Sequence, residues 1–156
     1  MISKYNLVID FDSTIIELET LEYIAQIALN NDPNKEDIIS KISKLTNKAM
    51  NGEIGFQDSL HLRFKTLNIH KEHIESAIIG LKNHIDKSFI DNIDFIKSKI
   101  DRIFIISGGF QEIIYPILNS IVELDWKVYA NTLVFNNKGY IEGVDSDNPL
   151  SHSNGK

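Results

Sequence analysis

The sequence predicts an α/β protein, with a parallel β-sheet core and a helical subdomain inserted after the first strand. Two short apolar runs, at residues 5–9 and 102–106, each end abruptly in polar residues, as buried parallel strands do. The stretch between them has helical periodicity and no strand pattern, which indicates an insertion rather than regular alternation of strands and helices. The length of 156 residues, with 42% hydrophobic and 24% charged, is typical of a soluble globular domain.

The inserted stretch divides into four predicted helices, which begin near residues 18, 35, 56 and 71. The first carries apolar residues on one broad face and is ended by Asp32-Pro33-Asn34. The second predicted helix ends at about Met50, before Asn51-Gly52. The fourth predicted helix ends at about Leu81. We therefore expect a helical cap at residues 17–81.

Alternation resumes after the cap. The predicted elements are a helix at 87–99, a strand at 102–106, a helix to about Asn119, paired strands within 127–144, and a polar loop from 145. The paired strands flank Asn136-Asn137-Lys138-Gly139, which is a turn sequence. The predicted core is thus built from residues 1–16 and 82–156.

Composition excludes several functions. A net charge of −6 argues against nucleic acid or an acidic membrane as partner, and the absence of cysteine excludes disulfides and thiolate catalysis. The sequence has neither a signal peptide nor an apolar run long enough to span a membrane, so we expect a cytoplasmic protein. The histidines have no metal-ligand spacing: His61, His70, His73, His84 and His152.

Polar residues at the two strand ends are the candidates for chemistry. Asp10 and Asp12 follow the first strand, and Ser107-Gly108-Gly109 follows the second. Ligands of open α/β sheets bind at the carboxyl ends of the strands, so these loops are expected to share a site. Paired carboxylates attract Mg²⁺, and a Ser-Gly-Gly turn into a helix offers backbone N–H groups to an anion. Together they indicate phosphoryl transfer through an aspartyl-phosphate.

These motifs resemble those of the haloacid dehalogenase-like phosphatases, in the form found in phosphoserine phosphatases. Asp10-Phe11-Asp12-Ser13-Thr14 resembles their first motif and Ser107-Gly108-Gly109-Phe110 their second. The run from Asn148-Pro149-Leu150 to Gly155-Lys156 resembles the approach to the third-motif lysine. The resemblance covers essentially the whole chain and implies a Rossmann-like core of haloacid dehalogenase type with an inserted helical cap.

The resemblance also implies roles for these residues. Asp10 would be the nucleophile, and Asp12 would protonate the leaving oxygen and later activate water. The Asp10 carboxylate and the Asp12 backbone carbonyl would hold Mg²⁺. Ser107, the Gly108 backbone and Lys156 would bind the phosphoryl oxygens.

The substrate would be recognised by the cap. By resemblance, Glu19 meets the substrate ammonium and Arg63 binds its carboxylate, which a guanidinium can grip through two hydrogen bonds. Met50 and Phe56 match apolar positions that line the same pocket. The implied reaction is hydrolysis of O-phospho-L-serine to L-serine and phosphate, the last step of serine biosynthesis.

Three alternatives stay open: a phosphotransferase, a phosphatase for another small phosphate monoester, and an inactive remnant. The family's fourth motif, a Gly-Asp-rich loop that supplies another metal ligand, does not occur before Lys156. We therefore expect a fragment that is truncated before this motif. When isolated, it should be unstable or aggregation-prone and should bind Mg²⁺ poorly. The sequence leaves the oligomeric state open.

Overall fold

A computed structural model describes residues 5–152, and its main sheet confirms the predicted fold class. The sheet has the strand order β1-β2-β3, formed by β1 (Leu7–Ile9), β2 (Ile103–Phe110) and β3 (Lys127–Asn131). Both pairings are parallel, with Leu7 opposite Ile103 and Phe104 opposite Lys127. The carboxyl ends of β1 and β2 therefore meet at one edge of the sheet.

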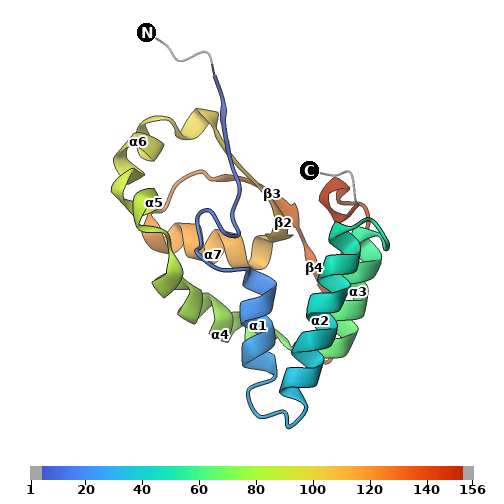
Figure 1. The fold of residues 1–156 in the computed structure, drawn as a ribbon. Helices are drawn as coiled ribbons and strands as arrows, with labels where there is room; N and C mark the ends of the chain where they lie inside the picture. The colour runs from blue at the N-terminus through green and yellow to red at the C-terminus, as the bar shows by residue number, and fades with distance from the viewer. Residues whose placement is uncertain (1–4, 153–156) are drawn as a thin grey trace.

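Four consecutive helices follow β1, as predicted. They are α1 (Thr20–Ala28), α2 (Lys35–Met50), α3 (Phe56–Leu67) and α4 (Lys71–Leu81). Figure 1 shows α2 and α3 standing side by side, while α1 packs against α4. The helix α4 also contacts α7 (Gln111–Ile121), which lies against the sheet and joins the helical insertion to the core.

The two connections between the sheet and the four helices run alongside each other. The Glu17 N–H donates to the His84 carbonyl at 2.9 Å, and the Asp86 N–H donates to the Ile15 carbonyl at 2.8 Å. Ile16 and Ile85 form an antiparallel bridge between these two bonds. This short double connection lies at the proposed boundary between core and cap.

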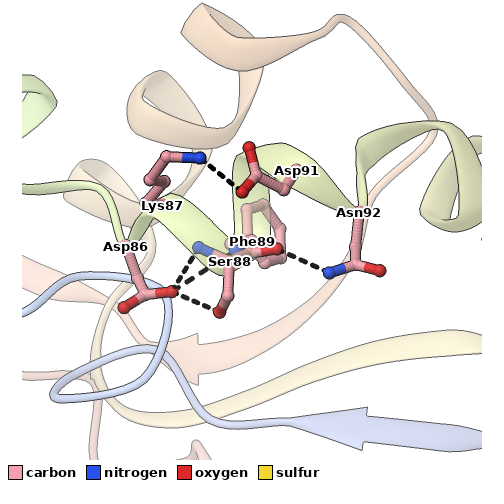
Figure 2. A network of polar contacts seen from close by, with 6 residues as sticks. All are labelled: Asp86, Lys87, Ser88, Phe89, Asp91 and Asn92. Atoms are coloured by element: carbon pink, nitrogen blue, oxygen red, sulfur yellow. Dashed lines mark hydrogen bonds and ion pairs between the residues drawn. The ribbon is translucent and has the colours of Figure 1, made fainter.

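A capped helix marks the return of the chain to the core. The Asp86 carboxylate accepts hydrogen bonds from the backbone N–H groups of Ser88 and Phe89 at the start of α5 (Lys87–Asp91) (Figure 2). Hydrogen bonding to the charged form lowers the pKa of Asp86, with the Ser88 hydroxyl as the largest cause. The carboxylate thus satisfies helix-end donors that would otherwise lack partners.

The prediction of a single helix at 87–99 is wrong, because the helix is interrupted at Asn92. The structure has α5, then α6 (Ile93–Ser98) and a 3₁₀ turn, η2 (Ile100–Arg102). The Asn92 side chain donates to the Ser88 carbonyl at 2.8 Å (Figure 2). An asparagine side chain that competes for backbone groups in this way favours helix ends.

A second sheet is formed by the hairpin of β4 (Leu133–Phe135) and β5 (Ile141–Val144). Its turn is the predicted one, with Gly139 at φ +83°. The prediction that residues 127–144 pair with one another is wrong for β3, which lies parallel to β2 in the main sheet. The hairpin reaches the insertion, where the Ile141 N–H donates to the Ile69 carbonyl and the Lys71 N–H to the Gly139 carbonyl, both at 2.9 Å.

Two further 3₁₀ turns complete the described elements. One, η1 (Lys82–His84), follows α4, and the other, η3 (Pro149–Ser151), lies within the predicted polar loop. The Asn148 side chain accepts the Leu150 N–H at 3.0 Å and donates to the Ala130 carbonyl at 2.7 Å. These bonds hold the loop against β3.

The core lies between the sheet and α7. Fully buried side chains come from the loop after β1, from β2 and from α7: Phe11, Ile15, Ile16, Ile103, Ile105, Ile113, Ile114 and Ile117. The opposite face is more open, since Val8 is 58% exposed and Tyr129 is 53% exposed. Within residues 5–152, no helix has the length and apolar character that crossing a membrane requires.

Candidate active site

A cavity of about 230 Å³ opens where β1, β2 and the cap helices meet. The loop after β1 and the start of α1 contribute acidic and polar groups, the end of β2 contributes backbone, and α3 contributes a cation. The lining residues that the sequence predicted are Asp10, Asp12, Glu19, Phe56, Arg63 and Gly108. The fold therefore brings together residues that lie up to 98 positions apart in the sequence.

An adjoining cavity of about 400 Å³ shares Glu19, Phe56, Arg63 and Gly108 with the first. It is extended by Met50 at the end of α2 and by Leu150 and His152, which sequence reasoning did not select. Met50 is 81% exposed, so its side chain lies at the mouth rather than in the cap core. Lys156 lies outside the described residues.

The loop after β1 is held by one carbonyl. The N–H groups of Thr14, Ile15 and Ile16 donate to the Phe11 carbonyl at 3.3, 2.9 and 3.1 Å. Ser13 turns the chain with φ +54°, a left-handed conformation that is uncommon for residues other than glycine. The loop places Asp10 and Asp12 at the cavity and directs the chain toward α1.

The two predicted acids occupy different environments. Asp10 follows β1, and its Oδ1 accepts the Phe11 N–H at 2.8 Å. Asp12 accepts hydrogen bonds from Thr20, and burial raises the pKa of Asp12, although the bonds from Thr20 act in the opposite direction. The negative charges of Glu19 and Asp10 raise the pKa of Asp12 further. A carboxyl group that keeps its proton to higher pH suits a general acid.

The Ser107 loop differs from the prediction. Strand β2 continues to Phe110 through a shift of register after Ile106, and α7 begins at Gln111 rather than at the glycines. The Gly109 N–H is occupied, since it donates to the buried Ser107 Oγ at 2.8 Å. The Ser107 hydroxyl oxygen therefore accepts this bond, and Ser107 is fully buried rather than among the residues that line the cavity.

Gly109 allows the acid to approach the loop. A Cβ at this position would lie 2.9 Å from Asp12 Oδ2 and 3.0 Å from Ser107 Oγ, closer than side-chain atoms pack. Asn131, which sequence reasoning missed, supports the loop from β3: it is fully buried and donates to the Gly108 carbonyl at 2.9 Å. The sequence gives little indication of this role, because Asn131 is a single asparagine at the end of a predicted strand.

The cap places charges of both signs at the cavity. The Arg63 Nε donates to the Ser59 carbonyl at 3.3 Å, and burial lowers the arginine pKa while Glu22 and then Glu19 oppose that change. An arginine stays charged at neutral pH even so. Glu19 accepts the Ser13 hydroxyl at 2.6 Å, which fixes its position beside the Asp12 loop. The pair can bind an ammonium and a carboxylate.

The donor set fits a hard divalent cation such as Mg²⁺. Asp10 and the Asp12 loop offer oxygen ligands at one end of the cavity, and Mg²⁺ commonly takes one or two carboxylates plus water and phosphate oxygens. Residues 5–152 contain no group of three or more His, Cys, Asp or Glu side chains that could hold a metal ion.

Several curated proteins that are similar to this chain are phosphoserine phosphatases. No protein-family model matches the chain. The phosphoserine phosphatase of Drosophila melanogaster is 27% identical over 147 residues, which cover 94% of this chain and 52% of that protein. The phosphoserine phosphatase of Lactococcus lactis is 33% identical over 143 residues, which cover 92% of this chain and 61% of that protein.

Solved structures agree with the sequence comparison. A phosphoserine phosphohydrolase-like protein of Francisella tularensis matches with a TM-score of 0.77 and 28% identity, over 94% of this chain and 67% of that one. A phosphoserine phosphatase solved as a phospho-aspartyl intermediate analogue matches with a TM-score of 0.68 and 26% identity, over 92% and 64%. The chain has the fold of the haloacid dehalogenase-like hydrolases. Among them, it is similar to phosphoserine phosphatases across nearly all of its length.

That similarity confirms the resemblance predicted from the motifs. The chain spans about half to three-fifths of the curated relatives it matches, with 52% of the Drosophila protein and 62% of the human one.

Proposed function

We propose that the protein is a phosphatase that hydrolyses O-phospho-L-serine to L-serine and phosphate. The observation that carries this proposal is the single cavity that joins Asp10 and Asp12 to Glu19 and Arg63. Two acids next to a backbone loop suit phosphoryl transfer, and the second pair suits the ammonium and carboxylate of an amino acid. The domain division, with the cap at 17–81, is part of the same proposal.

The first step forms a covalent intermediate. An Asp10 carboxylate oxygen attacks phosphorus, the bond from phosphorus to the seryl oxygen breaks, and Asp12 gives its proton to that oxygen. Ser107 and the Gly108 backbone hold phosphoryl oxygens as charge develops on them. When bound, Mg²⁺ at the Asp10 carboxylate and the Asp12 carbonyl neutralises negative charge that would repel the nucleophile.

The second step regenerates the enzyme. Water attacks phosphorus, Asp12 takes the proton of this water, and the bond from Asp10 to phosphorus breaks. The net reaction consumes one water and releases serine and phosphate. Lys156 is proposed to bind phosphoryl oxygens, and Met50 and Phe56 to limit the room for the substrate side chain.

Substrate selectivity follows from the charged pair. A plain alkyl phosphate would leave the exposed Glu19 and the half-buried Arg63 without substrate partners. A site built to bind such partners discriminates against an analogue that lacks them. Glu19 and Arg63 do not distinguish water from another alcohol as the acceptor. A phosphotransferase therefore remains the second candidate.

The test uses the complete protein, expressed from the whole gene, and measures phosphate release in Mg²⁺. We expect L-phosphoserine to be hydrolysed with a kcat/KM at least about 100-fold above that of glycerol phosphate, and a chelator to stop the reaction. Adding an acceptor alcohol such as homoserine separates the alternatives. A phosphorylated alcohol that forms in place of free phosphate would identify a phosphotransferase, and equal rates with both substrates would exclude the proposed selectivity.

A further inference from the structure

Thr20 is a buried polar residue whose bonds converge on one acid. It is the first residue of α1, is 3% exposed, and lines the cavity. Its backbone N–H donates to Asp12 Oδ1 at 2.9 Å, and its hydroxyl donates to the same oxygen. Since a threonine hydroxyl has one hydrogen, the bond to Asp12 uses the whole donor capacity of this side chain.

The Asp12 carboxyl also acts as the cap of α1. The residue before the helix, Glu19, makes no side-chain capping bond, because its carboxylate accepts the Ser13 hydroxyl instead. Asp12 supplies the missing acceptor from eight positions earlier in the chain. An acid that serves as a helix cap is tied to that helix and moves with it.

The two oxygens of Asp12 consequently have different surroundings. Oδ1 is taken by Thr20, on the cap side. Oδ2 lies toward the Ser107 loop, where a Cβ built on Gly109 would be 2.9 Å away. The phosphoryl group of the proposed substrate is bound by that loop, so Oδ2 is the oxygen that faces the leaving group.

We infer that Thr20 is a positioning residue: it holds Asp12 through Oδ1 so that Oδ2 alone faces the bond to be broken, and it links this orientation to the cap helix α1. The inference rests on the proposed phosphatase function. It assigns to the first residue of the cap a part in the chemistry as well as in substrate enclosure. Thr20 itself touches no reacting atom.

The test compares Thr20→Val, which removes the hydroxyl at nearly constant shape, with Thr20→Ser, which retains it. Thr66→Val is the matched control, because the Thr66 hydroxyl donates to the Leu62 carbonyl at 2.7 Å within α3 and lies outside the cavity. The readout is the kcat/KM for phosphoserine divided by the kcat/KM for p-nitrophenyl phosphate. Phosphoserine is an alkyl phosphate, whose leaving oxygen needs a proton. The nitrophenolate leaves without needing a proton. Phosphoryl transfer from p-nitrophenyl phosphate therefore does not depend on the orientation of the Asp12 carboxyl.

For Thr20→Val we expect kcat/KM with phosphoserine to fall by about tenfold or more, and that with p-nitrophenyl phosphate to change by less than about threefold. Thr20→Ser should recover most of the loss, and Thr66→Val should match the wild type. Equal losses on both substrates, or no loss, would overturn the inference.

A crystal structure of Thr20→Val gives a readout that does not require turnover. If the wild type hydrolyses p-nitrophenyl phosphate and another alkyl phosphate but not phosphoserine, the proposed substrate fails, and the same comparison proceeds with the accepted alkyl ester. If no monoester is hydrolysed, the structure decides. An Asp12 carboxyl that turns away from Gly109 in Thr20→Val and stays in Thr20→Ser supports the positioning role, whereas an unmoved Asp12 in both rules it out.

Discussion

At the residue scale, the site combines the carboxyl group of Asp12 with the guanidinium of Arg63, and burial affects both. The pKa of Asp12 is raised mainly by burial, and the pKa of Arg63 is lowered mainly by burial, so burial disfavours the charged form of each group. Both also have partners that limit this cost: Thr20 for the acid, and Glu22 and Glu19 for the arginine. Enclosure strengthens the interaction of each group with a charged ligand.

Replacing Arg63 with lysine tests recognition of the substrate carboxylate. A lysine keeps the charge but loses the planar pair of donors, so we expect KM for phosphoserine to rise by about 10–100-fold with a smaller change in kcat. Hydrolysis of p-nitrophenyl phosphate, which has no carboxylate, should change little. Arg102→Lys, in η2 and outside the residues that line the cavity, is the matched control. An unchanged KM for Arg63→Lys would remove this arginine from substrate binding.

At the element scale, the joint between α7 and β4 contains an acid that burial disfavours. The Glu112 Oε1 accepts the Leu133 N–H at 3.0 Å, but its buried Oε2 has no hydrogen-bond partner among the described residues. Burial raises the pKa of Glu112 above its usual 4.5. The folded state therefore holds its proton more tightly than the unfolded chain, and stability falls as the pH rises from about 4.5 through the folded-state pKa.

Glu112→Gln keeps an acceptor for Leu133 and removes this titration. We expect the variant to be more stable than the wild type at neutral pH by roughly 0.5 kcal/mol, a small gain because water still reaches part of the side chain. The difference should shrink below pH 4.5, where the wild-type carboxyl is protonated in both states. Urea unfolding at several pH values measures it, and a variant less stable than the wild type at neutral pH would contradict this account.

The hairpin of β4 and β5 depends on a glycine. Gly139 has φ +83°, and a Cβ there would lie 2.6 Å from His70 Nε2, which is itself 3.0 Å from the Lys138 carbonyl. Gly52 has a similar φ of +74° but no atom within 4 Å of its Cβ position. Gly52→Ala should therefore cost about 1 kcal/mol for conformation alone, and Gly139→Ala about 2–3 kcal/mol because it also displaces His70. Equal losses in thermal unfolding would show that the His70 contact is unimportant.

Sequence reasoning succeeded where pattern and chemistry are local. The apolar runs before Asp10 and Ser107, the four helices of the insertion and the turn at Gly139 follow from composition and periodicity. It failed where a contact between residues far apart in the sequence determines the strand pairing or the hydrogen-bond partner. Strand β3 joins β2 rather than the hairpin, and Asn131 finds its partner on another strand. Thr20 was missed because its role depends on an acid eight residues away across a left-handed turn.

At the scale of the whole molecule, β1 is the exposed element. It pairs with β2 alone among the described strands, and Leu7 and Val8 are 43% and 58% exposed. Backbone groups on its other side are available for pairing with a further strand. Apolar side chains next to an open strand edge favour association between chains.

Val8→Lys is expected to reduce self-association of this 156-residue chain several-fold, as measured by sedimentation at a series of concentrations. Ile79→Lys is the control, because Ile79 is 70% exposed on α4 and away from the sheet. Charge added there should have a smaller effect. Equal reductions would mean that general surface hydrophobicity, and not the strand edge, drives association.

The most direct test of the central claim is to trap the phosphoryl group on the protein. The complete protein would be mixed with L-phosphoserine and Mg²⁺, quenched in acid, digested and examined by mass spectrometry. We predict one added phosphoryl group on the peptide that contains Asp10, and neither this adduct nor phosphate release from an Asp10→Asn variant that melts like the wild type. Phosphate release by Asp10→Asn at the wild-type rate, or a phosphoryl group trapped on another residue, would contradict the assignment of Asp10 as the nucleophile.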